Sequence, residues 1–294
     1  MMRRIRTVAV FPTMFTLGNL VCGFFSIVVA ARVDAPTAES IARQPVSSDV
    51  SFAHPTRVLG ELDPNDPTQN LMLSGWLIFL ALIFDALDGH VARISRATSD
   101  FGAQLDSLCD VVTFGVAPGF LLVKMCPQPT FQYRDAIWII GASFAACAAL
   151  RLARFNVETG EEDDHLYFSG LPSPAAAAAI AGFGILFYEL RRESHALHDT
   201  VMIDHVIQWV LPFFAMLVAA LMVSRIPYPH IVNQTFRGQR SFGHVVGLVF
   251  LLVAIMSVRG YSVPIMGCGF VLYGPISYAW NRLHARREHP DPIF

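Results

Sequence analysis

The sequence predicts an all-α fold, a polytopic membrane bundle of about eight transmembrane helices. Hydrophobic residues make up 54% of the 294 residues and charged residues only 15%, whereas soluble domains carry about 25% charge. The mean hydropathy is +0.48. Apolar stretches of about 20 residues, the length that crosses a bilayer as a helix, recur along the chain.

The apolar stretches define the predicted spans in order. They lie at residues 11–31, 71–91, 105–126, 135–154, 170–190, 207–224, 242–258 and 261–281. Between the first two lies a long polar segment, 32–70, which contains "ELDPNDPTQN" and is predicted to be an irregular loop because proline and aspartate favour turns.

The distribution of basic residues predicts the orientation. With alternating spans and both termini inside, the larger share of the 21 Lys and Arg residues lies on the cytoplasmic side, as the positive-inside rule favours. We therefore expect an integral protein of the bacterial cytoplasmic (inner) membrane. The net charge of −2 gives no reason to expect nucleic acid as a partner.

The stretch "DALDGHVARISRATSDFGAQLDSLCD", residues 85–110, places several carboxylates where two predicted spans meet the membrane surface. Asp85 and Asp88 are three residues apart, and Asp106 and Asp110 are four apart, so each pair shares a helix face. A turn at 99–102 would make the two helices antiparallel. The four carboxylates are then expected to converge, with Asp100 set aside as a helix cap.

Clustered carboxylates repel one another and resist desolvation, so we expect them to take up protons or divalent cations. A cluster of oxygen ligands without His or Cys favours Mg²⁺ or Mn²⁺ over zinc. A pair of such cations is a common device for phosphoryl transfer. Gly89, Ala92 and Gly102 can let a ligand approach the backbone, and Arg93 can bind a phosphate.

The pattern Asp85-x2-Asp88-Gly89-x2-Ala92-Arg93-x8-Gly102-x3-Asp106-x3-Asp110 resembles the signature of the CDP-alcohol phosphatidyltransferases. The resemblance implies a membrane enzyme with a six-helix core, in which an alcohol displaces CMP from a CDP-linked lipid. It implies that the four aspartates hold two divalent cations, Mg²⁺ or Mn²⁺, and that Asp110 is also the base. Gly89, Ala92, Arg93 and Gly102 match positions that line the CDP-diacylglycerol site, and the family favours a homodimer.

Three further stretches resemble the phosphatidylserine synthase branch of this family: "FPTMFTLGNLVCGF" (11–24), "RLARFNV" (151–157) and "FSGLPSPAAA" (168–177). This resemblance implies L-serine as the acceptor. Arg151 or Arg154 can pair with the serine carboxylate, and Asn156 can orient its amino or carboxylate group. Asn19, a polar residue within the first span, is expected to contact CDP-diacylglycerol or to bond a neighbouring helix.

We expect one membrane domain, with the catalytic core at residues 1–190 and additional transmembrane helices at 191–294. Two other functions stay open. The same chemistry can use another acceptor, namely glycerol phosphate, inositol phosphate or choline. The protein could also be a cation transporter, because transporters contain intramembrane carboxylates. The carboxylates of transporters, however, usually lie near the bilayer midplane.

Overall fold

A computed structural model of the chain describes residues 10–33, 66–95, 100–126, 134–158, 167–193, 199–229 and 261–288. Helices dominate these residues, with one short sheet of two strands. The elements are α1 (Val10–Ala31), α3 (Pro67–Ser95), α4 (Asp100–Asp110), the π-helix η3 (Val111–Val116), α5 (Ala117–Met125), α6 (Arg134–Glu158), β1 (Tyr167–Ser169), α7 (Ser173–Glu193), α8 (Asp199–Val223), β2 (Pro227–Pro229) and α11 (Ser262–Glu288).

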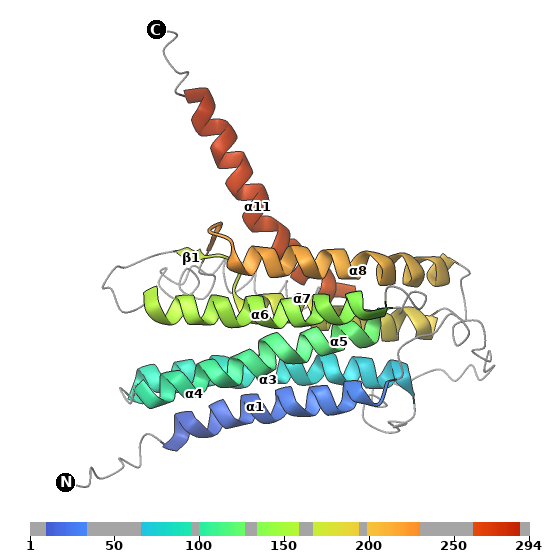
Figure 1. Cartoon of the computed structure of the whole chain (residues 1–294), viewed down its shortest axis with the longest axis horizontal. Helices are drawn as coiled ribbons and strands as arrows, with labels where there is room; N and C mark the ends of the chain where they lie inside the picture. Colours follow the sequence, from blue (N-terminus) through green and yellow to red (C-terminus); the bar gives the residue numbers. More distant parts are fainter. Residues whose placement is uncertain are drawn as a thin grey trace, which may run out of the picture.

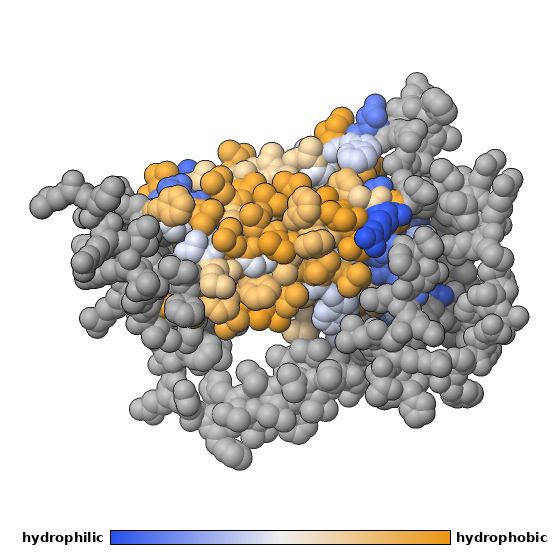
Figure 2. Space-filling view, turned by 90° about the horizontal axis from the view of Figure 1, so that it is seen from below, coloured by the Kyte–Doolittle hydropathy of each residue, from blue (hydrophilic) through white to orange (hydrophobic). Residues whose placement is uncertain are grey.

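Seven helical segments among the described residues are long and apolar enough to cross a membrane, with α4, η3 and α5 together forming one of them. The predicted polytopic helical membrane fold is thereby confirmed, while the predicted span at 242–258 lies outside the described residues. Most helices run side by side along the long axis of the molecule (Figure 1). Figure 2 shows a broad band of hydrophobic side chains with hydrophilic ones toward either end, as a lipid-facing surface requires.

Several helices begin earlier than the apolar pattern predicted. The predicted loop 32–70 is wrong at its end, because α3 already begins at Pro67. Asp66 accepts hydrogen bonds from the backbone N–H groups of Thr68 and Gln69 (2.8 and 3.4 Å), and so caps the new helix. Likewise, α4 begins at Asp100 and α8 at Asp199. Hydropathy identifies only the part of a helix that contacts lipid, so it does not predict polar turns at the ends of a helix.

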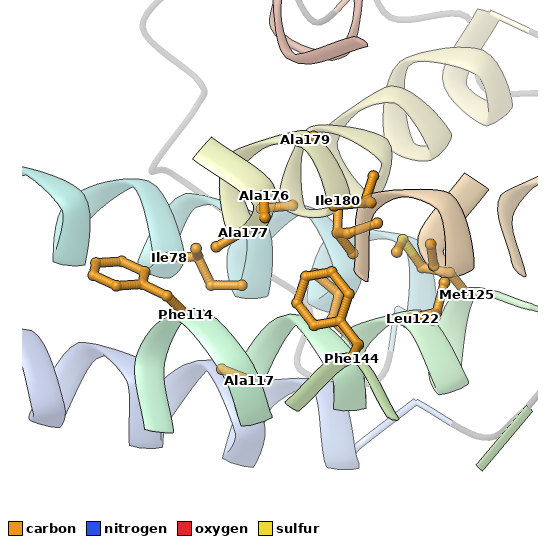
Figure 3. Packing of buried hydrophobic residues seen from close by; sticks show 14 of the residues in the cluster. Ile78, Phe114, Ala117, Leu122, Met125, Phe144, Ala176, Ala177, Ala179 and Ile180 are labelled. Atoms are coloured by element: carbon orange, nitrogen blue, oxygen red, sulfur yellow. The ribbon is translucent and has the colours of Figure 1, made fainter. Parts of the chain in front are cut away.

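Helix α7 lies at the centre of the bundle and contacts α3, α8 and α11. Its buried alanines allow neighbouring helices to approach closely. Such close packing drives helix association in a membrane, where the hydrophobic effect does not. Figure 3 shows Ala176, Ala177 and Ile180 of α7 facing the rings of Phe114 and Phe144. This packing places η3, α5 and α6 against α7.

The strands β1 and β2 pair antiparallel, with Phe168 opposite Tyr228. They join the segment that enters α7 to the segment that leaves α8. Helix α11 contains Pro275, and its last turns lead away from the bundle (Figure 1).

Candidate active site

Helices α3 and α4 bring three of the predicted carboxylates together. Asp85 of α3 and Asp106 and Asp110 of α4 each place a carboxylate oxygen so that these atoms lie within 4.8 Å of one another. Asp110 is buried, and the other two are half-buried. Because α4 begins at Asp100, the predicted turn at 99–102 is wrong for residues 100–102, which are helical. Asp110 is the last residue of α4, nearly three turns from its start.

Asp88 lies at the edge of this cluster and is held by α1. Thr16 donates a hydrogen bond from its hydroxyl to Oδ2 of Asp88. The other oxygen, Oδ1, is buried without a hydrogen-bond partner in the part of the chain that the structure describes. Asp88 also interacts electrostatically with Asp85 and Asp106, so it belongs to the same acidic group as the other three aspartates.

Asn19 of α1 bonds to the neighbouring helix, the second of its two expected roles. Its Nδ2 donates to Oδ1 of Asp110 at 2.9 Å, while its own Oδ1 is buried without a partner among the described residues. The hydroxyl of Thr113 donates to the backbone carbonyl of Asn19 at 3.2 Å. A Cβ atom at Gly23 would lie 2.3 Å from Oγ1 of Thr113, so glycine is what lets α1 approach this closely.

The π-helix η3 follows Asp110 directly. It buries Thr113, Phe114 and Gly115, and π-helical turns often mark functional sites. Sequence reasoning missed this helix and also missed Thr16 and Thr113. Thr16 had a signal: it precedes Asn19 by three residues, so both polar side chains share one face of a mostly apolar span.

The small residues of the signature lie beside the carboxylates. Gly89 is exposed, and a Cβ atom placed there would have no atom within 4 Å, so there is open space next to Asp88. Gly102 lies in the first turn of α4. The backbone of Ala92 and Arg93 is helical, and their side chains lie outside the described part of the structure.

The two arginines expected at the acceptor lie on α6. Arg151 is buried, donates from Nη1 to Oγ of Ser173 at 2.8 Å, and interacts electrostatically with Asp85 and Asp110. Arg154 donates from Nη1 to the backbone carbonyl of Val223 at 3.2 Å. The structure thus brings Arg151 next to the carboxylates and ties Arg154 to the end of α8.

Asn156 lies on another face of α6 and donates to the hydroxyl of Ser107 at 2.8 Å. Both residues line an open groove of about 310 Å³ between α4 and α6. The remaining lining is mostly apolar: Gln104, Leu108, Val111, Ala149, Leu152 and Ala153.

The donor set fits hard divalent cations. All ligands on offer are carboxylate oxygens, which suit Mg²⁺ or Mn²⁺. The partnerless Oδ1 of Asp88 and the repulsion among the four carboxylates are both relieved if cations bind. Asp85, Asp106 and Asp110 would hold one cation, and Asp88 extends the set toward a second.

A polytopic helical bundle with a carboxylate cluster shared by two helices fits the class of intramembrane enzymes that transfer phosphoryl groups. The family model of the CDP-alcohol phosphatidyltransferases matches residues 9–223, and the chain belongs to this family. It is therefore a phosphatidyltransferase.

The names of the relatives are more specific than the family, because each of them refers to serine. The chain is 36% identical over 209 residues to the CDP-diacylglycerol–serine O-phosphatidyltransferase of Methanocaldococcus jannaschii, covering 71% of this chain and 85% of the relative. The enzyme of the same name from Helicobacter pylori is 33% identical, covering 70% and 80%. The archaetidylserine synthase of Methanothermobacter thermautotrophicus is 35% identical over 158 residues, covering 53% of this chain and 57% of the relative.

Proposed function

We propose that this protein transfers the phosphatidyl group of CDP-diacylglycerol to the hydroxyl of L-serine, giving phosphatidylserine and CMP. One observation carries the proposal: a buried arginine, Arg151, lies beside a carboxylate cluster that matches the family signature. The cluster suits phosphoryl transfer, and the arginine suits an acceptor with a carboxylate. The relatives named for serine support the same choice.

The reaction needs a base at the attacking hydroxyl. The serine oxygen forms a bond to the lipid phosphorus, the P–O bond to CMP breaks, and CMP leaves with the bonding electron pair. The proton of the serine hydroxyl passes to the carboxylate of Asp110, within hydrogen-bond reach. Asn19 holds Oδ1 of Asp110 through its amide, which leaves Oδ2 for this proton.

The other residues bind and orient. Gly89, with open space around it, lets the CDP moiety approach α3, and we assign Ala92, Arg93 and Gly102 to the same subsite. Bound Mg²⁺ or Mn²⁺ at the aspartates would offset the negative charge of the two phosphates. The guanidinium of Arg151 takes the serine carboxylate, with Arg154 and Asn156 at the approach to it.

We also propose a location and an assembly for the enzyme. We assign the site to the cytoplasmic side of the inner membrane, where serine is available and the lipid keeps its acyl chains in the bilayer. Residues 1–190 form the catalytic core, the helices within 191–294 complete the same membrane domain, and the enzyme works as a homodimer.

An acceptor assay tests the proposal. Purified protein receives labelled CDP-diacylglycerol, Mn²⁺ and one acceptor at a time: L-serine, glycerol 3-phosphate, inositol phosphate or choline. We expect CMP release with L-serine and with none of the other three acceptors. A chelator should abolish the release with L-serine. Release with another acceptor and none with serine would contradict the serine assignment while leaving the family assignment intact.

A carboxamide at Asp110 tests the base. Asp110→Asn keeps the shape of the side chain and removes its proton acceptor, so kcat should fall by about 100-fold or more. Asp135→Asn is the matched control, because Asp135 is exposed at the first turn of α6, far along the chain from the cluster. A wild-type rate of Mn²⁺-dependent CMP release in Asp110→Asn would disprove the base assignment.

A further inference from the structure

Helix α11 contains a carbonyl that lacks its helical donor. Pro275 lies inside α11 and has no N–H, so the carbonyl of Val271, four residues earlier, receives no helical hydrogen bond from it. The hydroxyl of Tyr228 donates to this carbonyl at 2.9 Å. A side chain from β2 thereby replaces the bond that the proline removes.

The ring of Tyr228 is fully buried against α11. A Cβ atom at Gly274 would lie 2.3 Å from Cζ of Tyr228, so glycine at this position makes room for the ring. The ring also packs on Phe270, with the centroids 5.8 Å apart. Burial raises the pKa of Tyr228 to about 12, so the hydroxyl stays protonated at neutral pH and remains a donor.

The strand pair that carries Tyr228 adjoins both acceptor arginines. Figure 1 shows β1 beside the end of α8, with α11 passing next to them. Ser173, which accepts from Arg151, follows β1 at the first turn of α7. Val223, which accepts from Arg154, precedes β2 at the last residue of α8.

Backbone hydrogen bonds make these two segments one unit. Gly170, with φ of +88°, donates its N–H to the carbonyl of Ile226 at 2.9 Å. Leu171 donates to the carbonyl of Leu221 at 3.0 Å. A Cβ atom at Gly170 would lie 2.6 Å from the carbonyl oxygen of Met222, so only glycine fits against the end of α8. A shift of β2 must therefore move the partners of both arginines.

We propose that Tyr228 is a positioning residue for the acceptor: anchored on Val271 of α11, it holds the β1–β2 pair, and with it Ser173 and Val223, where they orient Arg151 and Arg154. This inference rests on the proposed serine transfer. Tyr228 and α11 both lie beyond residues 9–223, which the family model matches. Helix α11 thus anchors the β1–β2 pair from outside the catalytic core.

Tyr228→Phe removes only the hydroxyl, and the test is steady-state CMP release by the full chain. We expect the KM for serine to rise by about 3- to 10-fold, the range that one buried hydrogen bond supports. The kcat and the KM for CDP-diacylglycerol should stay within about twofold, since the carboxylates are untouched. Tyr273→Phe, which removes an exposed hydroxyl from α11, is the matched control and should change none of these constants.

A double variant tests whether Tyr228 positions β2 or only supplies a hydrogen bond to the carbonyl of Val271. In Tyr228→Phe/Pro275→Ala, the new N–H at position 275 bonds to Val271 within the helix, so the carbonyl is satisfied without the link to β2. We expect the KM for serine to stay raised, and this variant replaces the single one if Tyr228→Phe alone fails to fold. A wild-type KM in the double variant, or in Tyr228→Phe, overturns the inference. A wild-type enzyme that releases no CMP with serine instead contradicts the proposed function.

Discussion

Thr16 and Asn19 of α1 each donate a hydrogen bond to a different carboxylate of the site, although α1 supplies no carboxylate itself. Their three-residue spacing places both on one helix face, opposite Asp88 of α3 and Asp110 of α4. Residues that orient metal ligands in this way usually influence metal affinity as strongly as activity. Helix α1 therefore acts as the support of the carboxylate cluster.

Asn19→Leu removes the amide that holds Asp110 while keeping a similar volume. We expect the affinity for Mn²⁺ and the kcat to fall by about 10- to 100-fold, as for other residues that orient metal ligands. Titration of Mn²⁺ followed by electron paramagnetic resonance measures the affinity without requiring turnover.

The matched control for this variant is Ser26→Ala. Ser26 is also a buried polar residue of α1, but its hydroxyl contacts Ser74 instead of the carboxylates. Its loss should lower thermal stability without changing the affinity for Mn²⁺. Equal affinities in wild type and Asn19→Leu would show that Asn19 does not orient the site.

The sequence predicted that Asp85, Asp106 and Asp110 would lie close together, because spacings of three and four residues fix which side chains share a helix face. It did not predict the contacts of Thr16 or Thr113, since these depend on how α1 is rotated against α3 and η3. The same limit applies to the arginines: their place on α6 was evident, but the pairing of Arg151 with Ser173 depends on tertiary packing.

At the scale of elements, the segment from Asp100 to Met125 is one span that changes its winding at η3. Apolar periodicity located this span but could not reveal a π-helix, because its residues are as apolar as those of an ordinary helix. The winding places Thr113 against Asn19 and buries Phe114 in the core beside Ile78 (Figure 3). The site and the core are therefore joined through η3.

Gly23→Ala tests how closely α1 must approach η3. The added Cβ would lie 2.3 Å from Oγ1 and 2.9 Å from Cα of Thr113, so α1 must shift outward. Overpacking of this kind costs about 1–3 kcal/mol, and we expect the Tm in detergent to fall by about 3 °C or more, together with Mn²⁺ affinity. Gly269→Ala, where an added Cβ meets no atom within 4 Å, should leave both unchanged. A Tm for Gly23→Ala equal to that of the control would refute the close approach.

At the scale of the whole molecule, the orientation in the membrane decides which substrates reach the site. Arg225 is exposed just after α8, at the end of the bundle that holds the carboxylates, and Pro67 is exposed at the start of α3, at the opposite end. In a variant without native cysteines, Arg225→Cys should react with an impermeant maleimide only in inverted vesicles, and Pro67→Cys only in intact cells. The reverse pattern would place the site outside and exclude a cytoplasmic acceptor.

Helical spans and their order could be predicted because hydropathy reports directly on contact with lipid. The relative tilt of the helices could not, and neither could the β1–β2 pair, whose strands lie far apart in the sequence and are only three residues long. Such short strands form because packing already holds the start of α7 next to the end of α8.

We expect the carboxylate cluster to lower the stability of the protein when no cation is bound. Carboxylates as close as those of Asp85, Asp106 and Asp110 repel one another when ionised, so we expect them to destabilise the cation-free protein. Asp106→Asn relieves this repulsion, and with a chelator its Tm should exceed that of wild type by about 3 °C or more. Saturating Mn²⁺ should raise the wild-type Tm by mass action but leave the Tm of Asp106→Asn nearly constant. Asp135→Asn, at an exposed position, should follow wild type in both conditions. A lower Tm for Asp106→Asn with the chelator, or an undiminished response to Mn²⁺, would mean that Asp106 stabilises the fold by another contact and is not a cation ligand.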